Sequence, residues 1–454
     1  MRYAPLLCLL LAACAVGPDY RRPAVETPAA YKEAGDWIVA QPRDEAPRGK
    51  WWEVFGDPTL DGLMEQIDVS NQTLKAAEAR YTQARAATRA ARASLFPSVG
   101  ANADAQRSRR GSTGSATSYT VSLDARWEAD VWGRIRRQVE AARASEAAGA
   151  ADVEAARLSL QAELATNYFQ LRSTDAQRDL LEDSVKAFQA SLNIARNRYR
   201  AGVAAKVDVV QAETQLNSIE AQAIDLRATR AQLEHAIAVL VGKPAGSFGI
   251  APAKLEIRVP DIPPGVPSTL LERRPDIAAA ERRMAAANAR IGVAEAAYFP
   301  TLDLTGSGGF AGASLAHLFS APNRVWSLGA ALAGTLLDFG ARSAQVESSR
   351  AAYDEAVANY RGTVLGAFQE VENGLASVRW LAEEGRTQEE AARLARESVA
   401  LTVNQYKAGT VGFLNVVQVQ ATQLSEERNT VNVLGRRLAA SVALVKALGG
   451  GWQP

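Results

Sequence analysis

Few residues of the sequence have the chemistry of a catalytic or metal-binding centre. The chain has two histidines, His235 and His317, in segments of different predicted structure, so a histidine metal site or a serine–histidine pair is not expected. The tripeptide DFG at 338–340 has no accompanying nucleotide loop, and GSGGFAG at 306–312 follows a predicted strand but opens no helix. We therefore predict no catalytic residues, no metal, no cofactor and no enzyme activity.

The two cysteines lie within the first fourteen residues, which excludes disulfides from the body of the chain. One arginine followed by a short apolar run predicts a signal peptide over residues 1–13. The sequence LAAC at 11–14 resembles a bacterial lipobox, in which Cys14 is acylated as the first residue of a mature lipoprotein. An ordinary signal peptide with an incidental cysteine is the alternative. Ala15 after the cysteine resembles lipoproteins that are sent to an outer membrane.

The composition is that of a folded protein without a strong net charge. Lysine and arginine number 51 and aspartate and glutamate 50, so no net field favours nucleic acid. Apolar residues make up 47% of the chain, yet no stretch after the signal region has 18 consecutive apolar residues. If the mature chain crosses a membrane, we expect it to do so with strands.

The chain repeats itself. NRYRAG at 197–202 returns as NQYKAG at 404–409, a shift of 207 (404 − 197), and other segments return at the same or a similar shift. We predict a first repeat over 63–243 and a second over 270–450. A lipidated, extended N-terminal arm (14–62), a proline-rich linker (244–269) and a short tail (451–454) complete the chain.

Proline is absent from residues 98–243 and 323–453, so these stretches are free to form very long helices. A helix from Arg134 to Tyr199 would be about 100 Å long. Apolar residues step by four and three along it and along the segment after Gly202, which predicts a seam packed against a partner helix. The first seam runs through Leu181, Val185, Phe188, Leu192, Ala195 and Tyr199. The segment after Gly202 has Arg230 as a polar interruption, and the second repeat has Gln420, Glu427 and Ser441.

Strands are predicted where apolar and polar residues alternate. Residues 119–128 alternate over ten positions, and 326–334 are their counterpart in the second repeat. Extended stretches at 98–109 and 301–310 precede them, and residues 111–118 read as a loop. Four such strands cannot close a barrel in lipid, so copies of the chain would have to complete the wall. A soluble sheet with one wet face is the alternative.

Several motifs together resemble the TolC-like outer-membrane efflux factors, in the lipoprotein branch that serves resistance–nodulation–division pumps. They are WWEVFGDPTLDGLM (51–64), WEADVWGRIRR (127–137), RYRAGVAAKVDVVQAET (198–214), the stretch from LLERRPDI to YFPTLDLTG (270–306) and ALGGGW (447–452). The resemblance implies a mainly α fold with a small β part. A long α-helical barrel would continue into a transmembrane β-barrel, to which each chain contributes four strands. Three identical chains would complete both barrels, and each chain would consist of two tandem structural repeats.

The resemblance also implies a location, partners and a gate. The protein would lie in the outer membrane, contact its lipid, extend into the periplasm and accept drugs or other small toxic molecules from an inner-membrane pump through a periplasmic adaptor. A tyrosine of one hairpin bonds an aspartate of the other in this family, at positions that match Tyr406 and Asp208. An acidic ring would fall on Asn415 and Gln418, which are uncharged here. The adaptor-facing hairpin tips would be Gly202, Val203, Gly409 and Thr410.

Other functions remain open at this point. An outlet for protein secretion or for metal-ion efflux belongs to the same class of passive duct. A periplasmic coiled-coil scaffold lipoprotein belongs to another class and predicts no strand segments. The sequence does not identify the cargo.

Overall fold

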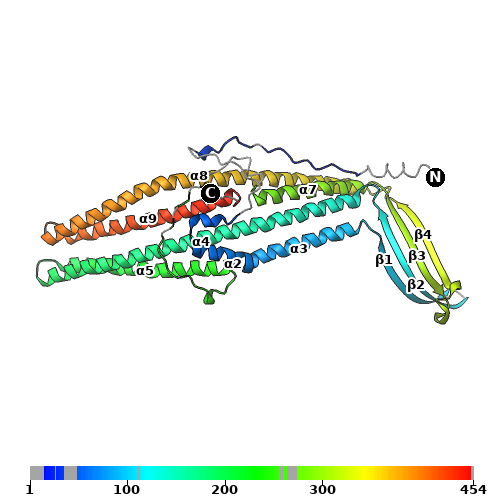
Figure 1. Ribbon diagram of the computed structural model, residues 1–454, viewed down its shortest axis with the longest axis horizontal. Coiled ribbons are helices and arrows are strands. Elements are labelled where there is room, and N and C mark those ends of the chain that lie inside the picture. The colour runs from blue at the N-terminus through cyan, green and yellow to red at the C-terminus, as the bar shows by residue number, and fades with distance from the viewer. Residues whose placement is uncertain are drawn as a thin grey trace. The chain divides into compact units, whose positions relative to one another are not determined.

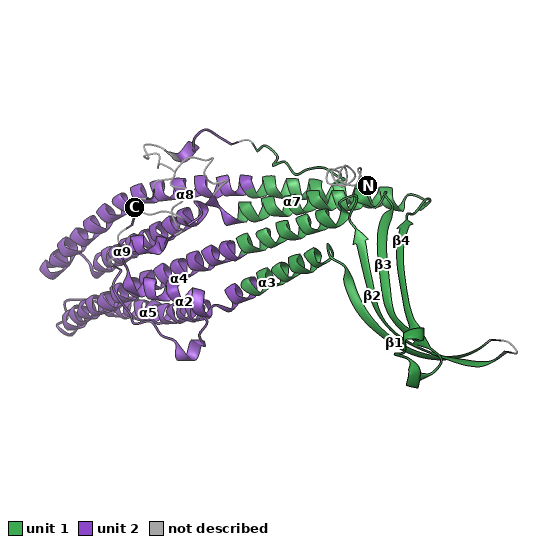
Figure 2. Ribbon diagram, turned by 45° about the vertical axis from the view of Figure 1, so that its right-hand side comes forward, with its two compact units in different colours: residues 1–25, 78–152, 276–363 green, residues 26–77, 153–275, 364–454 purple. Residues whose placement is uncertain are grey.

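The computed structural model describes residues 15–25, 27–34, 49–110, 113–255, 257, 259–260, 262 and 273–450. The predicted signal peptide, Cys14, the tail and part of the linker lie outside the described residues. The described chain forms two compact units (Figure 2). Unit 1 holds the described residues of 1–25, 78–152 and 276–363, and unit 2 those of 26–77, 153–275 and 364–454.

Helices make up most of the described chain, and one antiparallel sheet accompanies them (Figure 1). The helices are α2 (Pro58–Ser70), α3 (Gln72–Ala93), α4 (Arg134–Arg200), α5 (Lys206–Leu240), α7 (Pro275–Ala296), α8 (Ala341–Ala408) and α9 (Phe413–Ala447). The strands are β1 (Ser98–Arg110), β2 (Thr113–Ala129), β3 (Thr301–Gly312) and β4 (Arg324–Ala333). The long helix predicted from residue 134 is confirmed. None of the helices described here combines the length and the apolar character that a membrane crossing requires.

The tandem repeat is visible in the backbone. Helices α4 and α8 have 67 and 68 residues, and α5 and α9 have 35 each. Left-handed glycines recur at the same shift of 207 residues, at Gly133 and Gly340, Gly202 and Gly409, and Gly242 and Gly449. A positive φ favours glycine because it has no Cβ. The duplicated sequence therefore turns at the same three places in both copies.

The DFG tripeptide lies at one of these turns, before α8. Asp338 accepts hydrogen bonds from the backbone N–H groups of Gly340 and Arg342, both at 3.2 Å. In the first copy Asp130 accepts from the backbone of Ile135 and Arg136 at the start of α4, at 3.0 and 2.8 Å. The predicted strand-to-helix junction is confirmed, and the aspartates satisfy amide groups that a helix start leaves unpaired.

The sheet has the strand order β1-β2-β3-β4, so β1 and β4 are edges with one partner each within the chain. The prediction of a loop over 111–118 is wrong for residues 113–118, which belong to β2. Their pairing with β1, including Ser115 with Arg109 and Ser118 with Gln106, extends the ladder. A segment rich in glycine, serine and threonine is typical of a loop, but cross-strand backbone bonds decide the structure here.

In unit 1 the N-terminal arm lies against the helices. Val16 N–H donates to the carbonyl of Trp132 at 3.0 Å, and Arg137 donates to the carbonyls of Val16 and Gly17 at 3.2 and 3.1 Å. Gly17 approaches Gly292 of α7 so closely that a Cβ on Gly17 would lie 2.3 Å from the Gly292 Cα. The prediction of an extended arm up to residue 62 is wrong at its end, because residues 51–55 form a 3₁₀ turn and α2 begins at Pro58.

In unit 2 the residues of the predicted seams are buried or partly buried, except Tyr199. Leu181, Phe188 and Leu192 belong to one apolar cluster, but Tyr199 at the end of the seam is 46% exposed. Arg230, the polar interruption, is satisfied by the buried Asp175, whose carboxylate accepts from its Nε at 2.7 Å. A buried charge is tolerated when it is paired in this way.

Gly292→Ala is expected to detach the N-terminal arm. An added Cβ would lie 2.9 Å from both the Val16 carbonyl oxygen and Arg137 Cγ, so we expect destabilisation of about 1–3 kcal/mol. Limited trypsin digestion should cleave faster after the exposed Arg21. The control is Gly362→Ala, a helical glycine of the same unit with nothing within 4 Å of its Cβ position. That variant should gain up to about 1 kcal/mol. Equal cleavage rates in both variants would contradict the role of the glycine contact.

Candidate functional site: the paired helix hairpins

Both hairpin turns of unit 2 have the same hydrogen-bond pattern. After α4, Gly202 N–H donates to the Tyr199 carbonyl and Val203 N–H to the Arg198 carbonyl, both at 3.0 Å. After α8, Gly409 and Thr410 donate to the carbonyls of Tyr406 and Gln405, also at 3.0 Å. These are Schellman motifs, in which a left-handed glycine ends the helix. The four predicted tip residues, Gly202, Val203, Gly409 and Thr410, all lie in these exposed turns.

An apolar cluster lies behind the turns and joins the two hairpins. Tyr406 and Phe413 of the second hairpin pack together with ring centroids 5.4 Å apart. Both belong to a cluster with residues of the first hairpin, including Ala195 and Ala212. Because every one of these side chains is at least nine-tenths buried, the two hairpins share one core at this point.

Arg198 is the main polar connection between the two hairpins near the turns. Its Nη1 donates to the Tyr406 carbonyl at 3.0 Å, and its guanidinium carbon lies 4.7 Å from the centroid of the Tyr406 ring. Arg198 is therefore more than a solvated residue on a helix face. The repeat contained a signal for this role, because the equivalent position in the second copy is the uncharged Gln405.

The hydrogen bond expected between Tyr406 and Asp208 is not present within the chain. The Tyr406 hydroxyl is buried and has no hydrogen-bond partner. Burial raises the pKa of Tyr406, the positive charge of Arg198 lowers it, and Asp208 raises it. Asp208 is therefore close enough to act electrostatically. It is half-exposed in the first turn of α5, whereas the tyrosine ring is held against Arg198 and Phe413.

Asn415 and Gln418 are exposed on the first turns of α9. The first turn of α9 has no acidic residue, whereas the first turn of α5 has Asp208. Asn415 lies 207 residues after Asp208 and is its counterpart in the repeat. The structure therefore has Tyr406 and Asp208 near the turns without a hydrogen bond between them, and it leaves the two amides exposed on the surface of the chain.

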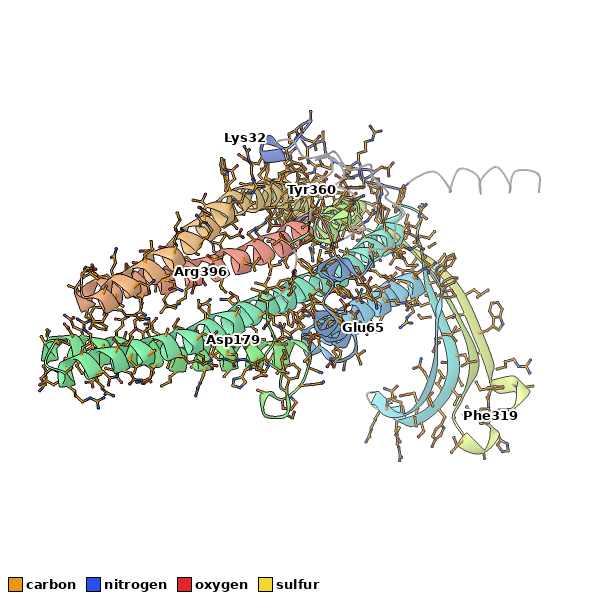
Figure 3. The ribbon with its side chains drawn as sticks, turned by 60° about the vertical axis from the view of Figure 1, so that its left-hand side comes forward. Lys32, Glu65, Asp179, Phe319, Tyr360 and Arg396 are labelled. Carbon is orange, nitrogen blue, oxygen red and sulfur yellow. The ribbon has the colours of Figure 1, made fainter. Side chains whose placement is uncertain are left out.

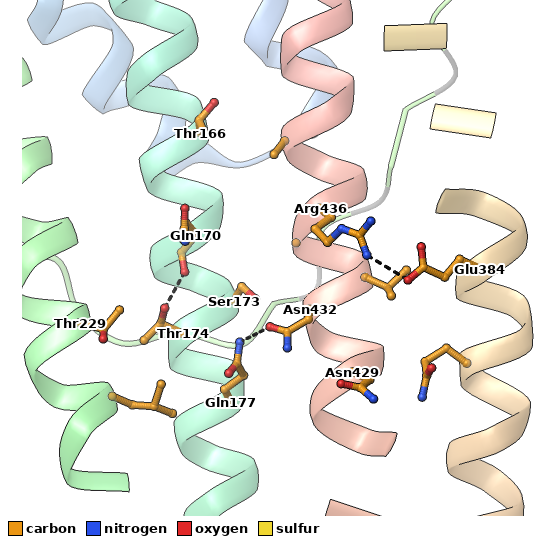
Figure 4. Close-up of a pocket in the computed structure, with 15 residues that line it drawn as sticks. Thr166, Gln170, Ser173, Thr174, Gln177, Thr229, Glu384, Asn429, Asn432 and Arg436 are labelled. Atoms are coloured by element: carbon orange, nitrogen blue, oxygen red, sulfur yellow. Dashed lines mark hydrogen bonds and ion pairs between the residues drawn. The ribbon is translucent and has the colours of Figure 1, made fainter. Parts of the chain in front are cut away.

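Further from the turns, the contact between the hairpins becomes polar (Figure 4). A cavity of about 660 Å³ is lined mainly by hydroxyl and amide side chains of α4, α5, α8 and α9. Gln177 donates to Asn432 across it at 2.7 Å, and Arg436 pairs with Glu384 at 2.9 Å. Gln420, one of the polar seam residues, donates to Ser191 at 3.0 Å, so its burial is compensated.

Two further polar seam residues are also satisfied. Glu427 accepts a hydrogen bond from Arg396 at 2.5 Å, and the Ser441 hydroxyl donates to the Arg437 carbonyl at 3.0 Å. The hairpins thus share an apolar cluster that extends from the turns to Leu181 and Leu424. Hydrogen-bonded polar side chains also join the hairpins, both within this span and beyond it.

An open four-stranded sheet together with two long helical hairpins per chain defines a class of outer-membrane channel. The profile of the outer membrane efflux protein family matches residues 63–243 and 266–450. The chain belongs to the outer membrane efflux protein family.

Related proteins are similar in sequence to this chain over nearly its whole length. The probable efflux pump outer membrane protein TtgC of Pseudomonas putida is 30% identical, over 98% of this chain and 94% of its own. The pyoverdine export outer membrane protein OpmQ of Pseudomonas aeruginosa is 31% identical, over 98% and 96%.

Solved structures have the same fold. The outer-membrane channel OprN is 32% identical with a TM-score of 0.90, covering 97% of this chain and 100% of that one. The open state of the Neisseria gonorrhoeae MtrE outer membrane channel is 29% identical with a TM-score of 0.87, covering 96% and 98%. The predicted fold class of helices with a small sheet of four strands per chain is confirmed.

Tyr406→Phe is expected to leave stability unchanged or to raise it by up to about 1 kcal/mol, because it removes a buried hydroxyl that has no partner. Tyr406→Ala also removes the ring between Arg198 and Phe413 and should cost about 3–5 kcal/mol. Denaturant unfolding of the detergent-solubilised protein measures both. A marked loss for Tyr406→Phe would mean that the hydroxyl finds a partner, such as Asp208, in the assembled protein.

Proposed function

We propose that the protein is the passive outer-membrane conduit of a tripartite export system and acts as a homotrimer. The observation that carries this proposal is the open sheet, whose edge strands β1 and β4 each lack a second neighbour within the chain. Unpaired backbone groups in hydrocarbon cost several kcal/mol each, so a membrane-embedded sheet must close on itself. Pairing of β4 in one copy with β1 in the next would close it.

Three copies of four strands would give a barrel of twelve, wide enough to have a lumen. One face of the sheet supports its placement in lipid. Large apolar side chains on that face are exposed in the single chain, with Trp326 at 75%, Leu328 at 81% and Leu332 at 68%. Such a patch is typical of a surface that contacts lipid or another chain.

The cargo in this proposal is a small organic molecule that is toxic or exported. Curated relatives are named for toluene, antibiotics and pyoverdine, which differ widely in chemistry. An inner-membrane resistance–nodulation–division pump would supply the energy. A periplasmic adaptor would contact the hairpin tips at Gly202, Val203, Gly409 and Thr410, which are exposed in the chain.

Acylation of Cys14 would anchor the arm in the outer membrane. The arm supports this assignment because residues 16 and 17, which follow the cysteine closely, are fixed against α4 and α7 of the unit that contains the sheet. Mass spectrometry of the mature N-terminal peptide tests it. An unmodified Cys14, or cleavage at another residue, would refute the lipid anchor.

Engineered cysteines in the edge strands should cross-link neighbouring copies. Ala103 of β1 and Trp326, Leu328 and Ala330 of β4 lie on the same face of the sheet. The remainder of the chain after Cys14 has no cysteine. Ala103→Cys, combined in turn with each of the three β4 substitutions, should give covalent dimers and closed trimers in membranes.

Ala103→Cys alone and Leu328→Cys alone are the controls. Each should remain monomeric on a denaturing gel. A stably monomeric protein that gives no cross-link and no conductance in a planar bilayer would overturn the proposed function.

Opening of the mouth would be an iris-like movement of the two hairpins, in which Arg198 acts as a latch. We expect Arg198→Gln to raise bilayer conductance several-fold, because it removes the guanidinium from the Tyr406 ring and weakens the bond to the Tyr406 carbonyl. Arg200→Gln is the matched control, because Arg200 is exposed and bonds only within its own helix end, to Asn197. Equal conductance of the Arg198→Gln variant and the unmodified protein would exclude the latch.

A further inference from the structure

The apolar face of the sheet carries charge at one end only. Successive strand residues point to opposite faces, so the register assigns every residue of the sheet to a face. Every second residue of each strand lies on the apolar face. These residues run from Val99 to Ala105 in β1, from Tyr119 to Ala129 in β2, from Leu302 to Phe310 in β3 and from Trp326 to Leu332 in β4. Among the strand residues whose side chains the structure describes, three on this face are charged: Arg107, Arg109 and Arg324.

These three arginines lie next to the apolar band, toward the strand ends that are remote from the helices. Arg107 and Arg109 follow Ala105 on β1, and Arg324 is in register with Phe310 and Val121. All three are exposed. Arg107 Nη2 donates to Ser115 of β2 at 3.2 Å, which places its guanidinium against the end of the sheet.

The dimensions of the apolar band agree with a membrane. From Ala129 to Tyr119 the face advances ten residues along β2, which is about 33 Å along the strand and about 25 Å for a strand tilted by about 40°. Aromatic residues border the band next to the arginines. They include Tyr119, Trp326 and the edge-to-face pair of Phe310 with Phe319, whose ring centroids are 5.4 Å apart. Figure 3 labels Phe319 near the end of the sheet. Aromatic girdles mark the level of the lipid headgroups.

The opposite face has a different charge. It carries Asp104, Asp124, Glu128 and Asp303, and one arginine, Arg126, which pairs with Asp303 at 3.3 Å. The segment that connects β3 and β4, residues 313–323, has no acidic residue. The two faces of the sheet are therefore separated by sign, which general solubility does not explain.

We propose that Arg107, Arg109 and Arg324 bind the phosphate groups of the anionic glycolipid in the outer leaflet of the outer membrane. The inference rests on the proposed function, which places the strand ends remote from the helices at the outer surface. Arginine binds phosphate through bidentate hydrogen bonds. Because β1 and β4 are the two free edges, closure of the barrel would bring Arg324 of one copy to the same seam as Arg107 and Arg109 of the next. The phosphate site is then completed by the neighbouring copy.

The test measures binding of diphosphorylated lipid A to the full-length, detergent-solubilised protein by native mass spectrometry. We expect a single substitution, Arg107→Gln, to weaken binding roughly fivefold, and the triple substitution with Arg109→Gln and Arg324→Gln to weaken it on the order of a hundredfold. Dephosphorylated lipid A should bind the unmodified protein as weakly as the diphosphorylated form binds the triple variant. Inorganic phosphate at equal concentration should not displace the lipid.

Arg126→Gln is the matched control, because it removes an arginine from the opposite face of the same sheet. It should leave lipid A binding unchanged. The proposal would be overturned if the triple variant bound lipid A as well as the unmodified protein does. It would also be overturned if Arg126→Gln weakened lipid A binding as much as the triple substitution does, or if inorganic phosphate displaced the lipid. Bilayer conductance of the same preparations separates the two levels of inference. A conducting protein whose triple variant binds lipid A normally refutes this site alone, and a protein that neither conducts nor forms trimers refutes the proposed function as well.

Discussion

The structure depends on one constraint, which is that a sheet of four strands leaves two rows of backbone groups unpaired. Water can form hydrogen bonds with those groups and hydrocarbon cannot. A single copy with the free edges β1 and β4 is therefore stable in water but not in the hydrocarbon of a membrane. The side chains of β4 are likewise uncovered, because every residue of this strand is exposed in the single chain, including large apolar ones. The chain thus has a well-packed helical core and a sheet whose surface is complete only when other molecules cover it.

Duplication supplied two copies of the same scaffold, and some of the differences between the copies lie beside the hairpin turns. The positive-φ glycines and the helix lengths are kept at a constant shift, because they determine the path of the backbone. The side chains behind the turns have diverged. Phe413 of the second copy corresponds to Lys206 of the first, and Gln405 corresponds to Arg198. One hairpin therefore supplies the cation and the other supplies the ring and the carbonyl that receive it.

The sequence was sufficient for features that depend on local pattern. The absence of proline and the spacing of apolar residues predicted α4 nearly to the residue. Alternation predicted β2 and β4, and the extended stretches before them predicted β1 and β3. The sequence was insufficient where the burial of a side chain depends on contacts between segments that are distant in the chain. Tyr199 and Tyr406 are equivalent in the repeat, yet one is 46% exposed and the other 4%, because only the second packs against both Phe413 and Arg198. Both residues of the expected tyrosine–aspartate bond lie near the turns, but the bond itself depends on orientation, which a motif does not specify.

The distribution of polar and apolar contacts between the hairpins determines which part of their interface resists separation. Hydrogen bonds such as those of Gln177 with Asn432 and Gln420 with Ser191 can be exchanged for bonds to water, so their net cost on opening is about 1 kcal/mol each. The apolar cluster around Tyr406 and Phe413 has no such substitute, because its exposure costs about 25 cal/mol for each Å². Resistance to separation is therefore greatest along this cluster, which extends from the turns to Leu181 and Leu424, and Arg198 adds its bond at the end beside the turns.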